Sequence, residues 1–426
     1  MRTVLFITTA LLCLSAQSSY AQGNEPQTGK ICGTAEGMKA LYDAYPSAKA
    51  EAEALEIFTQ QFTQQQAKST ANPTYTIPCV FHVYGSTQGG YPITDALIQL
   101  ALDGVNDDFN GKNSDYGTVH NQFKALRSTL DIKFVLAKLD PSGNPTTGVL
   151  YYPVKTGYAS LTKHNAEIAQ ESWDNYKYLN VFVMEDLYGD GITNNSGYSF
   201  YPNNQMNDSG FSRIIYNGRY LATNNTANPE FASVLTHEFA HYFNLQHTFE
   251  GGCTTPNDNV SDTPPCTTAQ GCHSSATANA PLNCNNDLVN AENYMDYNTN
   301  CYKMFTKGQV TRMMAGLNHT SRITLWDYGN LVATGLVGIN DIAATAVYNV
   351  YPNPNNGSFG FDLGADAGEY CSITITDVTG REVYSDHVSA ATRHYNVDIT
   401  GQQPGLYLLF VQTDNASRTV QKIHIR

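Results

Sequence analysis

The sequence predicts an α/β domain followed by a small all-β sandwich. Between residues 75 and 250, apolar and β-branched runs typical of buried strands alternate with segments whose apolar residues recur at helical spacing. From residue 342 onward, short alternating runs separated by turn residues carry no helical pattern. At 426 residues, the chain is also long enough for two or three folded units.

The first residues have the pattern of a secretory signal peptide, which we place at residues 1–21. Arg2 precedes an apolar run over residues 4–14, and residues 19–21 (SYA) form a small-x-small cleavage signal. The alternative, a membrane anchor, needs roughly 20 apolar residues, and this run is much shorter. No later segment is apolar enough to span a membrane, so we expect no transmembrane segment.

The net charge of the chain argues against two classes of binding partner. The formal net charge is -14 and the pI is about 5.1. Nucleic acid and anionic lipid would be repelled, so we expect neither as a partner. The acidity is compatible with an exported protein that binds cations.

Residues 22–70 are rich in Ala, Glu and Gln and include a helical stretch, AKAEAEALEIFTQQFTQQQAK. This segment has few apolar residues large enough to build a core, so it is not expected to fold as an independent domain. Its position between the signal peptide and the α/β region suggests a propeptide.

The elements of the α/β region follow in order, and we place this domain at residues 71–335. Strand patterns cover residues 75–85, 132–140 and 177–185, and apolar residues at helical spacing cover residues 93–111. A further helix is expected at HEFAHYFNLQH, which begins at His237.

This last segment has the pattern of a metal site. Residues four apart on a helix differ by about 40° in direction, so His237 and His241 can bind one ion. Glu238 points to the side, where it can hold a water molecule. His247 would lie about 240° round from His241 if the helix continued. The helix must therefore stop, and Asn244 is the residue best suited to the left-handed turn that brings His247 back.

Three imidazoles with one open position predict a catalytic zinc site, because structural zinc sites are closed by four protein ligands. The alternative is an ordinary surface helix with scattered histidines. The segment resembles the metzincin zinc signature His-Glu-x-x-His-x-x-Gly-x-x-His, with Asn in the Gly position. Metzincins also carry a Met in a tight turn beneath the zinc, and NYMDYN supplies Met295, with Tyr297 two residues later.

The surroundings resemble the pappalysin family of metzincins over roughly residues 73–320. The segments that carry the resemblance are HTFEGGC, DNVSDTPPC, NYMDYNTNC, FTKGQVTRMM, LDPSGNPTTGV and YLNVFV. The family implies a mixed twisted sheet, an active-site helix and an irregular C-terminal subdomain. It also implies a zinc endopeptidase that hydrolyses peptide bonds of proteins and binds calcium. Asp258 and Asp262 are then candidate calcium ligands, and their alternative role is to cap turns.

The resemblance implies a mechanism. Zinc polarises the substrate carbonyl and lowers the pKa of a water molecule, from which Glu238 takes a proton as general base. Tyr297 would stabilise the oxyanion. Cys32, in a Cys-Gly pair of the propeptide, resembles a cysteine switch whose thiolate holds the zinc until the segment is removed. The alternative is a disulfide from Cys32 to Cys79 or to another domain.

Without Cys32, the α/β region has an even number of cysteines, which could form three disulfides in any of 15 pairings. They are Cys79, Cys253, Cys266, Cys272, Cys284 and Cys301. A second zinc site is the rival interpretation, and its ligands would be Cys266, Cys272, His273 and Cys284.

Residues 336–426 are the predicted sandwich. Its motifs VYPNPNNGSFGF, ITDVTGREVY, GLYLLFVQTD and KIHIR resemble, in this order, the C-terminal sorting domain of type IX secretion cargo. The resemblance implies the type IX secretion machinery as a partner and a mature protein that is secreted or attached to the bacterial cell surface. The alternative is a binding module.

Two other functions compete with the endopeptidase. One is a catalytically silent surface adhesin on a protease scaffold, which would be expected to lose Glu238 or a metal ligand. The other is a metal-storing or structural protein, which would close the fourth metal position with a ligand from the mature chain.

Overall fold

The computed structural model describes residues 32–66, 74–160, 163–221, 233–254, 257–267, 282–298, 301–337, 350–362, 370–378, 381–389, 394–413 and 418–426. The predicted signal peptide, and residues 22–31 and 67–70 of the predicted propeptide, lie outside these ranges. None of the described helices is both long and apolar enough to cross a membrane.

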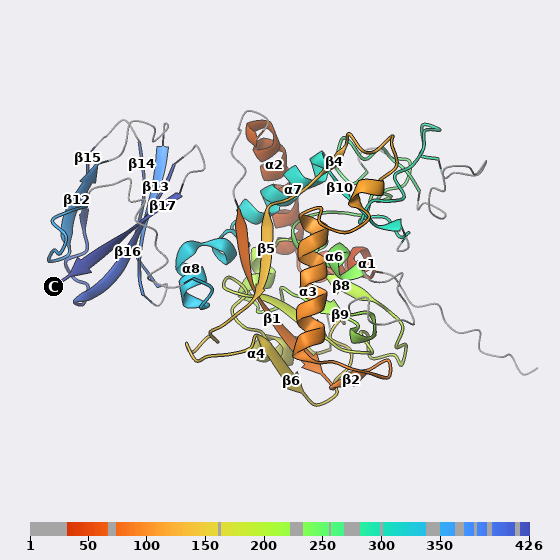
Figure 1. Ribbon diagram of the computed structural model, residues 1–426, viewed down its shortest axis with the longest axis horizontal. Coiled ribbons are helices and arrows are strands. Elements are labelled where there is room, and N and C mark those ends of the chain that lie inside the picture. The colour runs from red at the N-terminus through yellow and green to blue at the C-terminus, as the bar shows by residue number, and fades with distance from the viewer. Residues whose placement is uncertain are drawn as a thin grey trace, which may run out of the picture.

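A six-stranded sheet forms the centre of the α/β region (Figure 1). Its strands are β1 (Tyr75–Tyr84), β5 (Ile132–Leu136), β6 (Val149–Tyr152), β7 (Leu179–Val183), β8 (Gly197–Ser199) and β9 (Ile214–Tyr216). The order is β5-β1-β7-β9-β8, and β6 also pairs with β1. All pairs are parallel except β8 with β9, so β8 is an antiparallel edge strand. Because both faces of β1 are covered, its sequence is a nearly continuous apolar run.

Helices cover both faces of this sheet. On one face, α3 (Asp95–Phe109) and α6 (Val234–Tyr242) pack against each other, and Phe109, Phe134 and Phe239 make edge-to-face contacts beneath them. On the opposite face lie α4 (Asn165–Glu171) and α5 (Asn204–Asp208), whose Ile168 and Met206 share a core with Phe182 of β7. The sheet therefore holds α6 against a packed layer.

Short elements complete this region. They are β2 (Thr87–Gln88), β3 (Tyr91–Pro92), η1 (Tyr116–Thr118), β4 (Arg127–Ser128), η2 (Gly218–Tyr220), β10 (Phe305–Thr306), α7 (Lys307–Asn318), η5 (Ile323–Trp326) and α8 (Tyr328–Ala333). Between α6 and β10, the described residues form turns and isolated bridges, as expected of an irregular subdomain. At the start of α7, Thr306 and Gln309 form a capping box.

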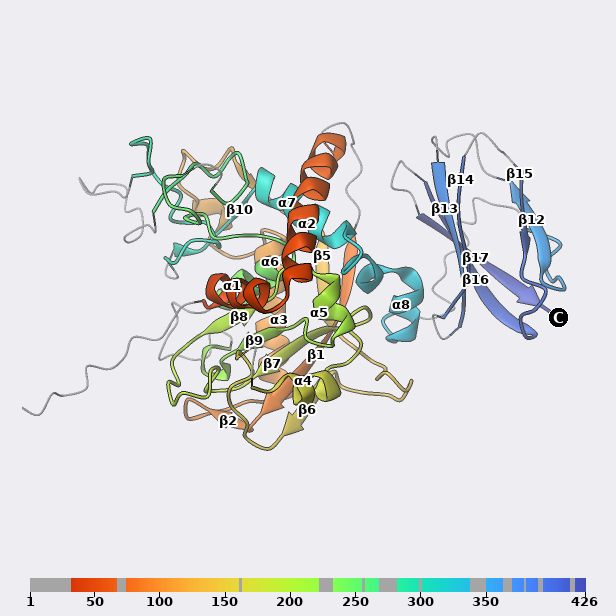
Figure 2. The same cartoon turned by 180° about the vertical axis from the view of Figure 1, so that it is seen from behind.

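Two helices precede the sheet and lie on the α/β region without a core of their own (Figure 2). Helix α1 (Thr34–Ala44) contacts β8, and α2 (Pro46–Gln66) contacts α5 and α7. Only Ala48, Leu55 and Thr59 of α2 are buried.

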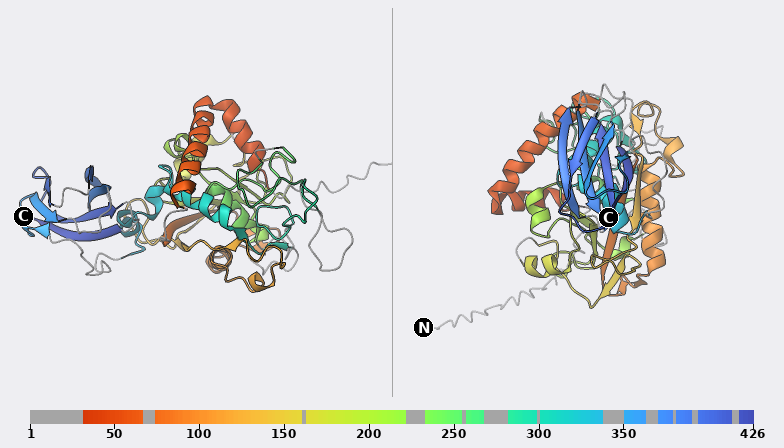
Figure 3. Two further views of the ribbon diagram at one scale, coloured as in Figure 1. Left: turned by 90° about the horizontal axis from the view of Figure 1, so that it is seen from above. Right: turned by 90° about the vertical axis from the view of Figure 1, so that its left-hand side faces the viewer.

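The C-terminal region is the predicted all-β sandwich, and it lies at one end of the molecule (Figure 3). One sheet has the order β11-β12-β15 and the other β14-β13-β16-β17. The strands are β11 (Val350–Tyr351), β12 (Ser358–Asp362), β13 (Tyr370–Asp377), β14 (Glu382–Ser389), β15 (His394–Asp398), β16 (Gly405–Thr413) and β17 (Arg418–Ile425). Helix α8 joins the two regions, because its Val332 packs with Leu408 and Phe410 of β16.

Candidate active site

Helix α6 presents two of the three candidate zinc ligands, His237 and His241, one turn apart. Their Nε2 atoms are 3.0 Å apart, and Nε2 of His247 lies 3.2 Å from that of His241. All three side chains are at most 1 % exposed. The structure therefore brings together the three imidazoles that the sequence pattern selected.

The chain turns back to His247 at Asn244. Asn244 has a φ of 84°, in the left-handed region expected for it. The N–H of Asn244 donates to His241 O (2.9 Å) and that of Leu245 to Ala240 O (3.1 Å), which is the Schellman pattern of a helix end. The turn also orients a ligand, because Leu245 O lies 2.6 Å from His241 Nδ1.

Each imidazole has an acceptor at its other ring nitrogen. Nδ1 of His237 lies 2.6 Å from Tyr294 O, and Nδ1 of His247 lies 3.3 Å from an Oε2 of Glu250. These acceptors place the ring proton on Nδ1 and leave the Nε2 lone pairs facing one another. Burial lowers the pKa of His237 to about 3, so its ring is neutral at pH 7.

Cys32 completes the cluster from the segment before α1. Its Sγ lies 3.4 Å from His241 Nε2, and the four ligand atoms all lie within 4.8 Å of one another. Burial beside Glu238 raises the pKa of the Cys32 thiol. Lone pairs that converge without a proton between them repel one another, and a cation removes that repulsion. Ligand separations near 3.3 Å are what tetrahedral Zn–N bonds of about 2.0–2.1 Å require, so these residues fit zinc.

Glu238 lies beside this cluster and is fully buried. Its Oε2 accepts a hydrogen bond from the Thr34 hydroxyl (3.4 Å), while Oε1 has no partner among the described residues. Burial raises the pKa of Glu238 to about 8. A Cβ on Gly197 would lie 2.4 Å from Oε1, so only glycine allows edge strand β8 to pass this close to the carboxyl group.

The NYMDYN segment lies directly beneath the histidines. Met295 is fully buried, and its carbonyl accepts a hydrogen bond from Thr248 N (3.1 Å), next to His247. The ring of Tyr297 lies 4.9 Å from that of His247, and its hydroxyl donates to Cys32 O (3.3 Å). Tyr297 is thus near the site, with its hydroxyl hydrogen-bonded to the backbone carbonyl of Cys32.

The two calcium candidates are engaged in hydrogen bonds. Asp258 accepts from Thr263 Oγ1 (2.6 Å), and Asp262 accepts from Thr306 Oγ1 (2.6 Å) and from Gly308 N (2.9 Å). These bonds correspond to the alternative role as turn and cap residues. Calcium binding by these residues stays a prediction.

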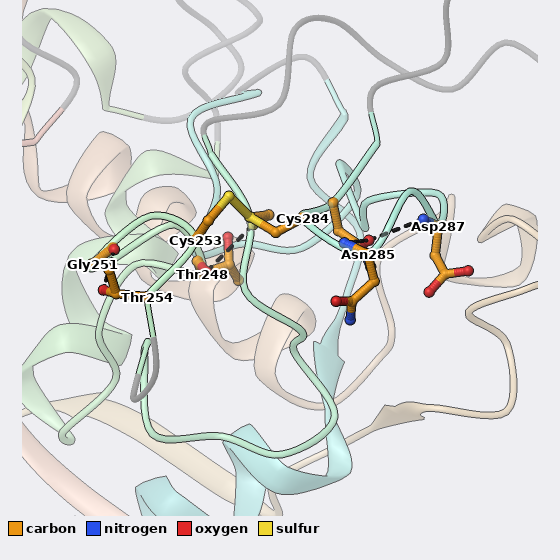
Figure 4. Close-up of a disulfide and its surroundings, with 9 residues drawn as sticks. Thr248, Gly251, Cys253, Thr254, Cys284, Asn285 and Asp287 are labelled. Atoms are coloured by element: carbon orange, nitrogen blue, oxygen red, sulfur yellow. Dashed lines mark hydrogen bonds between the residues drawn. A yellow bond between two sulfur atoms is a disulfide. The ribbon is translucent and has the colours of Figure 1, made fainter.

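The cysteines only partly follow the expectation from their even number. Cys253 and Cys284 form a disulfide (Figure 4), and Cys301 is also disulfide-bonded. Cys79 and Cys266 are free and buried. The prediction of three disulfides among these six cysteines is therefore wrong. Their positions explain this: the Cys79 side chain lies in the core beneath β1, and the Cys266 thiol donates to Thr248 O (3.4 Å).

The rival zinc site is also excluded, because the Cys284 sulfur is taken by the disulfide. Two of its other proposed ligands, Cys272 and His273, lie outside the described residues. Cys32 is free, so it forms no disulfide with Cys79 or another cysteine.

Three residues of the site were missed from the sequence. Thr34 and Gly197 contact Glu238, and Glu250 contacts His247. The position of Glu250 three residues after a ligand could have suggested its role. Thr34 and Gly197 become neighbours of Glu238 only through the tertiary fold.

Comparisons with known proteins identify similar families and chains. Residues 162–318 match the model of a peptidase family described as pregnancy-associated plasma protein-A, and residues 349–426 match a secretion system C-terminal sorting domain. An extracellular metalloprotease of Sordaria macrospora is 36 % identical over 149 residues, which span 34 % of this chain and 49 % of that protein. One of Podospora anserina is 28 % identical over 311 residues, which span 70 % of this chain and 92 % of that protein.

Two solved structures from Tannerella forsythia are also similar. A promirolysin mutant has a TM-score of 0.55 at 26 % identity and covers 69 % of this chain and 96 % of its own. Mature mirolysin in complex with a cleaved peptide has a TM-score of 0.52 at 28 % identity and covers 61 % of this chain and 97 % of its own.

Proposed function

We propose that the chain is an exported zinc endopeptidase of the pappalysin type, made as a latent zymogen. Its matches to a peptidase family model, to a secretion sorting domain, to extracellular metalloproteases and to promirolysin support this proposal. Its substrates would be proteins or peptides. One observation carries the proposal: three buried imidazoles and one thiol converge at a point beside the buried carboxyl group of Glu238.

His237, His241 and His247 would hold the zinc, and Cys32 would hold it in the latent form. Bound zinc supplies Lewis-acid polarisation of a carbonyl and acidification of a water molecule. Backbone carbonyls fix His237 and His241 through Nδ1, so the chain provides a preorganised ligand set.

We infer that a peptide substrate binds along edge strand β8. The prosegment already uses it, because Gly33 N donates to Gly197 O (3.1 Å) and Ser199 N donates to Thr34 Oγ1 (3.0 Å). A peptide that replaces the prosegment would find the same backbone donor and acceptor.

Glu238 would act as general base and later pass the proton to the leaving amine. Among the described residues its Oε1 has no hydrogen-bond partner, and its Oε2 accepts a hydrogen bond from Thr34 of the prosegment. Removal of the prosegment would therefore free the carboxyl group for a water molecule. Tyr297 would stabilise the oxyanion once its hydroxyl is released from Cys32 O.

Latency would rest on Cys32, which occupies the fourth ligand position in the folded chain. The promirolysin match covers more of this chain than the mature mirolysin match, which supports a pro form here. We propose residues 22–70 as the prosegment, with the activating cut between the end of α2 at Gln66 and the start of β1 at Tyr75. Residues 1–21 would be the signal peptide, 71–335 the peptidase domain and 336–426 the sorting domain.

Cleavage of a peptide library by a chain that begins near residue 70 tests the proposal. We expect cleavage that is lost in Glu238→Ala and in the presence of a zinc chelator. A zinc-loaded, folded chain that cleaves no peptide would instead favour the adhesin. Calcium at Asp258 and Asp262 is tested separately, by a rise in melting temperature on adding calcium to the zinc-loaded chain.

A further inference from the structure

Asn244 stands where the metzincin pattern has glycine, and backbone conformation alone would favour glycine at a φ of 84°. In the structure the asparagine side chain has two partners. Its Nδ2 donates to Thr59 Oγ1 of α2 (3.0 Å), and its Oδ1 accepts from Arg312 of α7 (3.3 Å). The residue that turns the chain toward His247 therefore also contacts the prosegment.

Arg312 ties the same two segments together. Its Nε donates to Asn244 O (2.8 Å), and its Nη2 forms an ion pair with Glu56 of α2 (2.8 Å). The Arg312 side chain is 4 % exposed, so this pair is only weakly screened by solvent. We call Asn244, Arg312, Glu56 and Thr59 the Asn244 node.

Further contacts extend the surface that α2 covers. Glu51 accepts hydrogen bonds from Asn204 N (2.5 Å) and Gln205 N (3.3 Å) at the start of α5. Toward the other end of α2, the ring of Phe58 lies 5.9 Å from that of His319, and Phe62 packs against the main core. Thr59 follows Cys32 by 27 residues, so these contacts form a second attachment, separate in sequence from the thiol.

We propose that the Asn244 node is a docking site for α2, so that the prosegment stays bound to the catalytic region after its covalent link is cut. Asn244 replaces glycine because its side chain recognises this helix. The docked helix keeps Cys32 and Thr34 in reach of the ligand cluster, so the cut prosegment remains an inhibitor. This inference rests on the proposed zymogen and names its means of regulation.

The test uses the full chain with Glu238→Gln, to prevent self-cleavage, and with residues 67–73 replaced by a seven-residue site for a site-specific protease. After the cut, gel filtration shows whether the fragment that ends at Gln66 coelutes with the rest. We expect coelution, and we expect it to persist with Cys32→Ser, because α2 does not depend on the thiol.

Variants of α2 sharpen the test and leave the zinc-site turn unaltered. Thr59→Val removes the acceptor of the Asn244 amide, and Glu56→Gln removes the charge paired with Arg312. Each is expected to raise the dissociation rate of the fragment about tenfold. The matched control is Glu53→Gln, on an exposed position of the same helix, and it should leave the rate unchanged.

A double-mutant cycle tests the contact itself. In an Asn244→Gly background, Thr59→Val should have no further effect on the dissociation rate, and zinc content measured in parallel shows that the ligand cluster is intact. The proposed docking site would be refuted if the fragment dissociated at once from the chain with an unaltered Asn244 node. It would also be refuted if the effects of Asn244→Gly and Thr59→Val on the dissociation rate were additive. If the fragment is retained but the mature chain cleaves no peptide, the proposed function fails and the docking site stands.

Discussion

The catalytic region and the C-terminal sandwich differ in what they bury. The catalytic region buries charged and polar side chains, among them Glu238, Arg213 and Arg322, each at 0 % exposure. In the described part of the sandwich, the buried polar residues are Asn355 and Thr376. Burying a polar group costs free energy unless it is hydrogen-bonded, so the catalytic core depends on specific partners. The sandwich depends mainly on the burial of apolar side chains. It can therefore serve as a sorting domain whose stability does not depend on the active site.

The largest expected effect is that of Glu238→Gln. The change keeps the shape of the buried side chain and removes the proposed general base, so peptide cleavage should fall about 10²- to 10⁴-fold. Because the buried carboxyl group has a raised pKa, the neutral amide should not lower the melting temperature. The control is the same change at Glu382, in a strand of the sandwich, with cleavage rate and melting temperature measured together. Equal losses in both variants would contradict the separation of the two regions.

Truncation of a core side chain in the sandwich should not change the rate of peptide cleavage. Leu409 is fully buried, so Leu409→Ala should lower the free energy of unfolding of the sandwich by about 2–5 kcal/mol. Leu102→Ala in α3 should destabilise the catalytic region by a similar amount. Calorimetry of the two transitions, with a cleavage assay, distinguishes the regions. A single transition that both variants lower equally would show that they unfold as one unit.

His82 should make one contribution to the stability of the catalytic region that is lost in acid. His82 is fully buried, and burial lowers its pKa from 6.5 to about 4. Between these values His82 binds a proton in the unfolded chain and not in the folded chain, so its contribution to stability falls as pH falls, by about 3 kcal/mol in all. His82→Phe should flatten this slope in chemical unfolding measured from pH 7 to pH 4. An unchanged slope would assign the acid sensitivity to other groups.

The smallest effect is expected where the two regions meet. The ring of Tyr328 in α8 lies 5.9 Å from that of Phe410 in β16. Tyr328→Leu keeps apolar bulk and removes this aromatic pair, so the sandwich should lose about 0.5–1.5 kcal/mol. Calorimetry should show this small loss, and a cleavage assay should show an unchanged rate. A loss of several kcal/mol would mean that the sandwich depends on the catalytic region.

Local spacing predicted the parts of this molecule that depend on local geometry. The positions of His237 and His241, the left-handed Asn244 and the strand at residues 75–84 follow from helix and strand periods. The acceptors Tyr294 O and Leu245 O are backbone atoms, which a side-chain pattern does not identify.

Contacts between residues far apart in the sequence could not be predicted from the sequence pattern. Gly197 reaches Glu238 only because β8 pairs with β9 at the sheet edge. The composition of residues 22–70 indicated a segment without a core, and it could not show that Thr59 meets Asn244. The cysteine count failed for the same reason, because pairing depends on distance and Cys79 lies inside the sheet.

Cys79 sets a condition on the order of assembly. It lies in the middle of β1, opposite Leu136 of β5 and Leu179 of β7, and it is fully buried. Before these strands meet, its thiol is open to any oxidant that joins Cys253 to Cys284. A chain that folds in an oxidising compartment must therefore close its central strands before its disulfides form, or Cys79 will be captured in a wrong bridge. Correct folding therefore depends on whether burial of the Cys79 thiol precedes disulfide formation.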